Sequence, residues 1–537
     1  MSAVTDHLQE SIDMHWYIYC GTLVFLMQLG FAMLEVGSVR KKNSKNILIK
    51  NFMDACIGAL MWWACGYLIA FGTNSERDEF AGSANLSTNQ YLFLANSVSV
   101  KDYQFWFFQF AFAATAASIT SGAVAERCQM SAYFMYSSIL VGFIYPVVVH
   151  WCWSKDGFLS NFALSDDDGT TYNAGRNWSS IGVIDFAGSG VVHLTGGVCA
   201  FVGAWTVGPR TGRFVEGELV TKGFTPQSSA FQALGTFILW FGWYAFNCGS
   251  TLGLWPGAPT VAARVAVTTT ISAAACAVTS CFIGYIVSGT GEYSLPAVAN
   301  GILAGLVSIT AGCPVVEPWA AFIIGVIGAF IYHGWSTLMI RMNIDDVVDA
   351  VAVHGACGAW GVIAAALFAK NDLICEYAVS LCEGEAGYRN EQAGLFYSTN
   401  GKLLGTAALQ IICIIGWVGV TMGIAFQCFN LLDLLRVSEE DEFFGLDASH
   451  HGGIDDEYVN SLGIDALVKM KDEGAKLDKF ALLAMCIDQN VNPLPILVKF
   501  DEASKGSSSI NDSAGYDSLI EMVTPNSPVK VIDVDFA

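Results

Sequence analysis

The chain has 537 residues, of which 53% are hydrophobic and only 14% are charged, and its formal net charge is −22. Soluble domains carry about 25% charged residues, so this composition excludes an ordinary soluble protein. The negative charge is concentrated in residues 433–537, which hold 21 acidic residues against 8 lysines and arginines. Because no basic face is evident, nucleic-acid binding is not expected.

Several apolar stretches approach or exceed the roughly 20 residues that a helix needs to cross a bilayer. We read eleven of them, at residues 16–36, 47–72, 104–124, 131–152, 186–208, 229–250, 261–286, 296–312, 318–340, 350–369 and 403–430. The sequence therefore predicts an all-α polytopic membrane protein with eleven transmembrane helices. An N-terminal segment (1–15) precedes this domain (16–430), and a short segment (431–453) and an acidic, partly disordered extension (454–537) follow it.

The basic residues of the short loops predict the orientation of the chain. Positions 40–45 hold four basic residues after the first span, and arginines also follow the third, fifth, ninth and eleventh spans. Since basic loops stay in the cytoplasm, the N-terminus is expected outside and the C-terminus inside. Glycosylation motifs at Asn85 and Asn177 fall in predicted exterior loops and favour the plasma membrane. Cys375 and Cys382 lie close together in a polar loop and are a candidate disulfide pair.

An internal repeat places an acid and a histidine in two equivalent spans. Asp185 precedes His193 by eight residues, and Asp346 precedes His354 by eight residues. A Gly-Ala-Trp triplet follows in each copy, at 203–205 and 358–360. The copies lie in the fifth and tenth spans, so the chain is expected to hold two five-span halves in inverted orientation plus one extra helix. Inverted repeats commonly place the functional site at the midplane between the halves.

The two histidines are the first candidate site, because an ionisable group inside a span marks a functional site by default. A neutral imidazole can donate from one nitrogen and accept on the other. Facing His193 and His354 rings can therefore share a proton and line a narrow path. The alternatives are a buried neutral histidine bonded to a backbone carbonyl and a zinc site. Zinc needs about three or four ligands, and no third ligand is evident, so no metal or other cofactor is expected.

Acids and aromatic residues surround the histidine pair in the sequence. Asp185 and Asp346 each open a span, where an acid is favoured by the helix dipole and by capping. Asp185 can also stabilise an incoming cation. The aromatic set, with one hydroxyl, consists of Phe108, Phe112, Trp153, Trp243, Phe246 and Ser250. Such residues usually pack in a core or at the membrane interface, but together they can attract a small cation through their ring faces.

A cation site above two buried histidines favours a substrate that is charged outside and can lose a proton. A charge at the bilayer centre costs from about 3 to over 10 kcal/mol. Deprotonating an amine with a pKa near that of lysine costs about 4–5 kcal/mol at pH 7. Potassium cannot lose a proton, so this chemistry separates two cations of similar size.

Five sequence blocks resemble the Amt/Mep/Rh superfamily of ammonium transporters. "DFAGSGVVHLTGG" is similar to its signature, and the other blocks are "FFQFAFAATAASITSGAVAER", "YPVVVHWCWS", "FGWYAFNCGS" and "DDVVDAVAVHGACGAWG". They follow the family order, extend the resemblance over residues 16–452, and resemble the plant-type AMT branch most. The resemblance implies a homotrimer in the bilayer with one pore per subunit, which carries ammonium and its analogue methylammonium.

The resemblance also implies roles for single residues. Phe108, Trp153 and Ser250 would form the exterior recruitment site, which Asp185 would support. Phe112 and Phe246 would form the gate beneath it, and His193 and His354 the twin-histidine pair. Trp243 and Asp346 would lie on the conduction path.

The segment after the last span resembles a cytosolic activation segment of the plant-type branch. In "LLRVSEEDEFFGLDASHHGG", Gly445 matches the central glycine, and Ser449 falls where the family carries a phosphorylatable threonine. A phosphate would add about −1.5 to −2 charges, so a kinase acting on this segment would be a regulatory partner.

The main hypothesis is transport with net charge, and two alternatives stay open, electroneutral passage of ammonia and an ammonium sensor. The pore can pass neutral ammonia without net charge, or it can move ammonia plus a proton. The long acidic tail also allows an ammonium sensor that signals through the cytosol. An intramembrane enzyme is not expected, because no serine or cysteine nucleophile is paired with the histidines.

Overall fold

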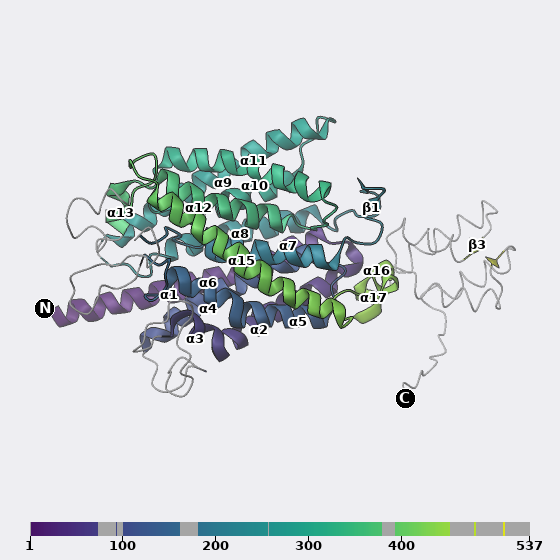
Figure 1. Cartoon of the computed structure of the whole chain (residues 1–537), viewed down its shortest axis with the longest axis horizontal. Helices are drawn as coiled ribbons and strands as arrows, with labels where there is room; N and C mark the ends of the chain where they lie inside the picture. Colours follow the sequence, from purple (N-terminus) through teal and green to yellow (C-terminus); the bar gives the residue numbers. More distant parts are fainter. Residues whose placement is uncertain are drawn as a thin grey trace.

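The computed structural model describes residues 2–72, 93, 100–161, 181–255, 257–377, 392–451, 477–478 and 509–510. The main helices of this part are α1 (Ser2–Ser38), α2 (Ser44–Met61), α4 (Val100–Ala123), α5 (Met130–Ile139), α6 (Tyr145–Trp153), α7 (Thr195–Val207), α8 (Ser229–Gly249), α9 (Ala258–Ser288), α10 (Leu295–Thr310), α11 (Pro318–Arg341), α12 (Cys357–Phe368) and α15 (Lys402–Leu431). They run side by side as one bundle (Figure 1).

Shorter elements connect these helices or interrupt them. They are η1 (Lys41–Asn43), η2 (Trp62–Gly66), α3 (Tyr67–Phe71), η4 (Leu140–Ile144), η5 (Ser189–Leu194), β1 (Phe214–Val215), β2 (Glu218–Leu219), η6 (Val351–Ala356), α13 (Asn371–Tyr377), α16 (Glu439–Phe444), α17 (Leu446–His450), β3 (Leu477–Asp478) and β4 (Ser509–Ile510). β1 pairs antiparallel with β2, and β3 pairs antiparallel with β4. The start of α1 and α13 lie at one end of the bundle, and β1, α16 and α17 lie at the other (Figure 1).

Every apolar stretch predicted from the sequence coincides with a helix or with a run of consecutive helices. Within the described residues, eight helical segments are long and apolar enough to cross a membrane, and α10 is a shorter apolar helix. The chain is therefore a multi-pass helical membrane protein. One boundary differs from expectation, because α1 begins at Ser2 and residues 2–15 extend the first helix. A side-chain bond of 3.0 Å from Gln9 to Asp13, one turn apart, supports this extension.

The two copies of the repeat share a backbone irregularity and pack against each other. Each begins with a π-helical segment that carries the histidine, η5 before α7 and η6 before α12. Such segments often occur at functional sites. A methyl group on Gly197 would lie 2.2 Å from the backbone nitrogen of Gly355, and one on Gly358 would lie 2.5 Å from the carbonyl oxygen of Ser189. Glycine therefore lets the two copies meet at the centre of the bundle.

Small residues also bring α1 and α8 together. A methyl group on Gly235 would lie 2.3 Å from the backbone nitrogen of Leu34, and one on Gly37 would lie 2.5 Å from that of Gln232. This close contact fixes the register of α1 and α8. The two helices carry several side chains of the candidate functional site.

Loops that were predicted to share one side of the membrane meet in a cluster of charges. Arg210 bonds Asp345 and Glu126, at 2.7 Å in each case, and Arg40 also pairs with Glu126. Burial alone would raise the pKa of Glu126, but the two arginines outweigh it and lower the pKa to about 2. These residues follow the first, third, fifth and ninth predicted spans, so the cluster ties four loops together.

One disulfide expectation falls partly within the described residues. Cys375, on α13, is disulfide-bonded. Cys382, its predicted partner, lies outside the described residues, as do the two glycosylation motifs at Asn85 and Asn177.

Candidate functional site

Aromatic rings predicted to lie along one path do form a continuous stack. The ring centres of Phe112 and Phe246 are 4.0 Å apart with an angle of 25° between their planes. The ring centre of Phe108 lies 4.8 Å from that of Phe112, and Trp153 meets Phe112 edge-on at 6.0 Å. The stack joins α4, α6 and α8, and Phe108, Phe112 and Phe246 are buried. The stack therefore brings rings from three helices into contact at one place in the bundle.

Trp153 and Ser250 are held at the ends of their helices by backbone contacts. The indole nitrogen of Trp153 donates to the backbone oxygen of Asp185 at 2.8 Å. The Ser250 hydroxyl, at the end of α8, donates to the backbone oxygen of Phe246 at 2.9 Å. A hydroxyl that donates to the backbone keeps its lone pairs available as acceptors. The serine oxygen can therefore accept a bond from an ammonium-type donor close to the ring stack.

The two histidines of the repeat are in direct contact. Nδ1 of His193 and Nδ1 of His354 are 3.2 Å apart, and the rings are nearly parallel, with 21° between their planes. Both side chains are buried, and Nε2 of His193 has no hydrogen-bond partner among the described residues. One nitrogen of this contact must carry a hydrogen and the other must accept it. Nε2 of each ring takes no part in this contact and faces away from the other histidine.

Trp243 supports the histidine pair from the side. Its ring stacks on His193, with centres 4.9 Å apart and an angle of 13°, and His193 also lies 5.6 Å from Phe246. The indole nitrogen donates to the Thr310 hydroxyl at 2.9 Å. This bond fixes the indole, and the indole limits the tilt of the imidazole. The ring stack and the histidine pair are thus in direct contact through His193 and Phe246.

Asp185 caps the π-helical segment that carries His193. Its Oδ2 accepts from the backbone nitrogens of Gly190 and Val191, at 3.0 and 2.8 Å, and from the side chain of Gln410 at 2.8 Å. Its Oδ1 is buried and has no partner among the described residues. The capping role expected from the sequence is therefore present. The second oxygen leaves the carboxylate free to act on another group.

Asp346 caps the second copy in the equivalent way. Its Oδ2 accepts from the backbone nitrogen of Val351 at 2.8 Å, and its Oδ1 accepts from that of Val348 at 3.4 Å. The spacing from acid to capped residue is the same as between Asp185 and Gly190. The acid of each repeat therefore orients the segment that holds its histidine.

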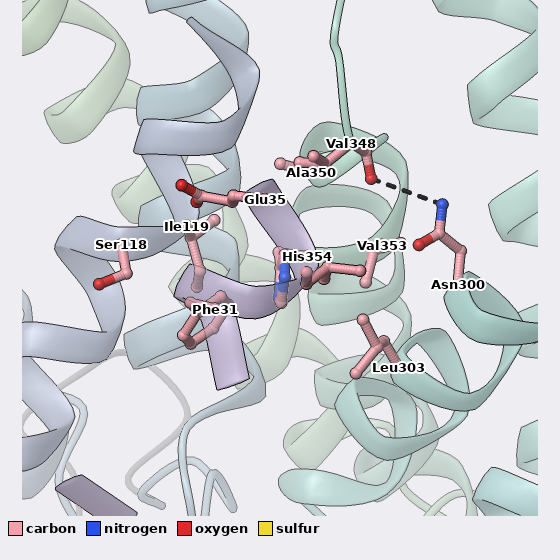
Figure 2. Close-up of a pocket in the computed structure, with 11 residues that line it drawn as sticks. Phe31, Glu35, Ser118, Ile119, Asn300, Leu303, Val348, Ala350, Val353 and His354 are labelled. Atoms are coloured by element: carbon pink, nitrogen blue, oxygen red, sulfur yellow. Dashed lines mark hydrogen bonds between the residues drawn. The ribbon is translucent and has the colours of Figure 1, made fainter. Parts of the chain in front are cut away.

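A small cavity lies beside His354 (Figure 2), and His193 is not among the residues that line it. Its polar lining consists of Glu35, Ser118, Asn300 and His354, and its apolar lining includes Phe31 and Leu303. A functional role for Glu35, Asn300 or the amide of Gln410 was not predicted from the sequence. Glu35 could have been found, because it is an acid within the first apolar stretch. Gln410 could not, since its contact with Asp185 spans 225 residues of sequence.

The segment after the last span docks on the loops of the same chain. Gly445 has a positive φ of 97°, and a methyl group on it would lie 2.6 Å from Cβ of Lys42. The Leu446 amide donates to the side chain of Asn43 at 2.9 Å. The Ser449 hydroxyl donates to the Gly445 oxygen at 3.3 Å. Only glycine fits this crossing without strain.

A second contact anchors the same segment. Glu442 accepts from the Thr211 backbone nitrogen at 2.7 Å and from Arg436 at 2.8 Å. Lys42 donates to the backbone oxygens of Glu442 and Phe443, at 3.0 and 2.6 Å. Burial and the nearby Arg40 charge lower the pKa of Lys42 to about 7. The segment thus bridges the loops after the first and fifth predicted spans.

Comparison with known proteins identifies the family. The chain matches the model of the Ammonium Transporter Family over residues 15–455. It belongs to this family. It is 43% identical over 432 residues to Ammonium transporter 1 member 1 of Arabidopsis thaliana, which covers 78% of this chain and 80% of that protein. It is 42% identical over 462 residues to Ammonium transporter 1 member 1 of Oryza sativa subsp. japonica, covering 83% of this chain and 85% of that protein.

Solved structures of the family share the fold. A protein described as Sensor Amt Protein has a TM-score of 0.67 and 31% identity, covering 83% of this chain and 100% of that chain. Mep2 of Candida albicans has a TM-score of 0.67 and 26% identity, covering 80% of this chain and 87% of that chain. The resemblance noted in the sequence, to the plant branch of the family, is confirmed. The named relatives are transporters and not enzymes.

Proposed function

We propose that this ammonium transporter carries ammonium inward by binding it at an exterior aromatic site, removing a proton, and passing ammonia along His193 and His354. Family membership supports ammonium transport. The observation that carries the mechanism is the 3.2 Å contact between the two buried imidazoles, next to the Phe112–Phe246 stack. A stack of rings beside a buried pair of imidazoles suits a small molecule that enters charged and crosses neutral.

The exterior site would consist of Phe108, Trp153 and Ser250. Ring faces attract a cation by about 0.5 to 2 kcal/mol each, depending on solvation, and the Ser250 oxygen can accept one N–H bond. Asp185 lies behind Trp153, and its free Oδ1 would stabilise the cation and the proton that leaves it. The rings of Phe112 and Phe246 would then have to part for ammonia to reach His193.

The histidine pair would separate ammonium from potassium by proton chemistry. Carrying a bare charge through the centre costs from about 3 to over 10 kcal/mol, while deprotonation costs about 4–5 kcal/mol. Potassium has no proton to lose. Asp346 would keep the second copy in register on the cytoplasmic half of the path. Net movement of one proton with each ammonia is the main hypothesis, and electroneutral passage of ammonia is the alternative.

The remaining expectations concern assembly and regulation. We propose a homotrimer in the plasma membrane, with eleven membrane crossings, an extracellular N-terminus and a cytoplasmic C-terminus. Asn85 and Asn177 would carry glycans outside. The docked segment around Gly445 would hold the pore active, and phosphorylation of Ser449 by a kinase would release it by adding negative charge to an acidic segment.

A sensor that signals through its tail is a second candidate. The similarity to a protein described as a sensor favours it, together with the extension beyond residue 455, where the family match ends. Deleting the residues after Gly453 would separate the two roles. Loss of signalling with intact flux would favour the sensor.

The first experiment is voltage clamp of oocytes that express the chain, with ammonium and then potassium at equal concentration. An inward current for ammonium alone would support charge movement with proton-based selectivity. Methylammonium uptake without current would favour the electroneutral alternative. Absence of both current and uptake would overturn the transport mechanism and leave the sensor.

A further inference from the structure

Glu35 is a buried acid on α1 that faces the path beyond the histidine pair. Its side chain is 2% exposed, and it lines the same cavity as His354 (Figure 2). Nothing in the proposed transport mechanism uses it. An ionisable group at this depth in a membrane protein is costly, and such groups commonly belong to proton or ion pathways.

The hydrogen bonds of Glu35 hold it in place without neutralising it. Its Oε2 accepts from the Asn51 amide at 2.7 Å, and its Oε1 accepts from the Ser121 hydroxyl. Both donors are neutral. Glu126 differs from Glu35 in this respect, because two arginines, Arg40 and Arg210, pair with its carboxylate and tie the loops together. The two bonds therefore hold the Glu35 side chain in one orientation, but neither donor carries a positive charge that would keep the carboxylate ionised.

The other charged groups near Glu35 are engaged elsewhere. On α2, Lys50 donates to the Cys128 backbone oxygen at 2.9 Å. Asp54 accepts from the Tyr133 and Ser137 hydroxyls, at 2.6 and 2.8 Å. Neither Lys50 nor Asp54 lines the cavity. Among the residues that line the cavity, Glu35 supplies the carboxylate and His354 supplies the imidazole.

The cavity suits a single small polar molecule between these two groups. Because Nδ1 of His354 faces His193, Nε2 is the nitrogen left for the cavity. The space open to a water-sized molecule is about 10 Å³, close to the least volume that holds one water. The side chains of Ser118 and Asn300 complete the polar lining. One water, or one ammonia, can therefore bridge the imidazole and the carboxylate.

We propose that Glu35 is the inner proton acceptor of the pore. This inference rests on the proposed function. At the outer site an N–H bond of ammonium breaks, and an N–H bond forms on Nε2 of His193. The hydrogen between the two rings then moves, so that an N–H bond breaks on Nδ1 of His193 and an N–H bond forms on Nδ1 of His354. The N–H bond on Nε2 of His354 then breaks as an O–H bond forms on the Glu35 carboxylate. Finally the O–H bond breaks and an N–H bond forms on the ammonia leaving the cavity, which restores ammonium and the carboxylate.

The position of Glu35 fits the end of such a path. Its backbone oxygen accepts from the Val39 amide at 2.9 Å in the final turn of α1. Ser38 is the last residue of that helix, and the charged loop cluster around Arg40 follows directly. A proton on Glu35 is thus one helical turn from the face of the bundle where the loops meet.

The test is the ratio of charge to uptake, measured in the same oocytes from clamp current and labelled methylammonium. Glu35→Gln keeps the size and one acceptor oxygen but cannot take a proton, and we expect the ratio to fall from one charge per molecule toward none while uptake persists. Glu35→Asp restores a carboxyl group and should restore charge. Asp54→Asn is the matched control, since Asp54 is also a buried acid held by neutral donors, Tyr133 and Ser137, and does not line the cavity.

The outcomes separate this inference from the proposed function. A wild-type chain that takes up methylammonium without current would overturn charge movement itself, whatever the variants do. A wild-type current with an unchanged ratio in Glu35→Gln would overturn the role of Glu35 alone. Equal loss of charge in Asp54→Asn would also overturn it, because the effect would then not depend on the cavity.

Discussion

Nδ1 of His193 lies 3.2 Å from Nδ1 of His354, although 161 residues of sequence separate the two histidines. The contact forms because each ring sits on a π-helical segment that is capped by its own aspartate, and because Gly197 and Gly355 let the two copies cross. The pair is therefore built twice from the same local pattern and then joined at the centre. A substitution of the histidine in either copy therefore tests the function of the pair.

Removing either imidazole should weaken the discrimination against potassium. We expect His193→Ala and His354→Ala to leave a space that water can fill, since the neighbouring polar groups remain and a polar cavity attracts water. A hydrated cation would then no longer have to lose a proton. The measurement is the ratio of potassium current to ammonium current under voltage clamp, which should rise about tenfold or more, equivalent to 1.4 kcal/mol of lost selectivity. An unchanged ratio in both variants would contradict proton-based selectivity.

The two carboxylate oxygens of Asp185 have different surroundings, so the capping role of this residue can be tested separately from its charge. Its Oδ2 takes the bonds from Gly190, Val191 and Gln410, while Oδ1 has no partner among the described residues. Asp185→Asn can place its oxygen at the Oδ2 position and keep these bonds. We expect the variant to fold with nearly unchanged thermal stability but to lose transport by about tenfold or more, because the charge is gone. Full transport by the asparagine variant would show that the cap alone matters, and Asp185→Ala should impair both properties.

The sequence predicted the apolar spans, the repeated Asp-to-His pattern and the facing histidines because these follow from local pattern. Apolar length locates a helix, and the repeated Asp-to-His spacing locates the equivalent residues. The supporting contacts did not follow from pattern. The ring of Trp243 stacks on His193, and Gln410 reaches Asp185, only because distant helices pack in a particular register. The cavity that joins His354 to Glu35 is likewise a product of packing between α1, α4, α10 and η6.

Gly445 is expected to control whether the tail segment stays docked. Alanine at this position would have to adopt a backbone conformation that favours glycine, with φ 97° and ψ 140°, at a cost of about 1–3 kcal/mol. Its methyl group would also clash with Lys42. We expect Gly445→Ala to release the segment and to lower methylammonium uptake. Gly416→Ala is the matched control, because a methyl group there meets nothing within 4 Å. Release is measured by protease cleavage between the last span and residue 451, and uptake that persists after release would contradict activation by docking.

Ser449 should act on the same docking contact when it gains negative charge. The hydroxyl lies close to the Gly445 backbone oxygen, in a segment that also contains Asp441 and Asp447. Like charges close together repel each other, so Ser449→Asp should raise protease cleavage and lower uptake in the same direction as Gly445→Ala. Ser449→Ala removes only one bond and should behave like the wild type. A stable, active aspartate variant would rule out phosphorylation of Ser449 as a release signal.

The loop cluster around Glu126 should make the fold sensitive to acid in a defined range. The pKa of Glu126 falls from 4.5 to about 2 in the folded protein, because Arg40 and Arg210 outweigh burial. A depressed pKa contributes stability that is complete above the unfolded value and is lost as the pH falls through the folded value. We therefore expect the thermal stability of the purified protein in detergent to decline between about pH 4.5 and about pH 2. Glu126→Gln leaves Arg40 without its acid partner, while Arg210 keeps Asp345. The substitution should cost about 3–5 kcal/mol, with a flatter decline over the same range. A variant that keeps the full acid dependence would show that other carboxylates cause it.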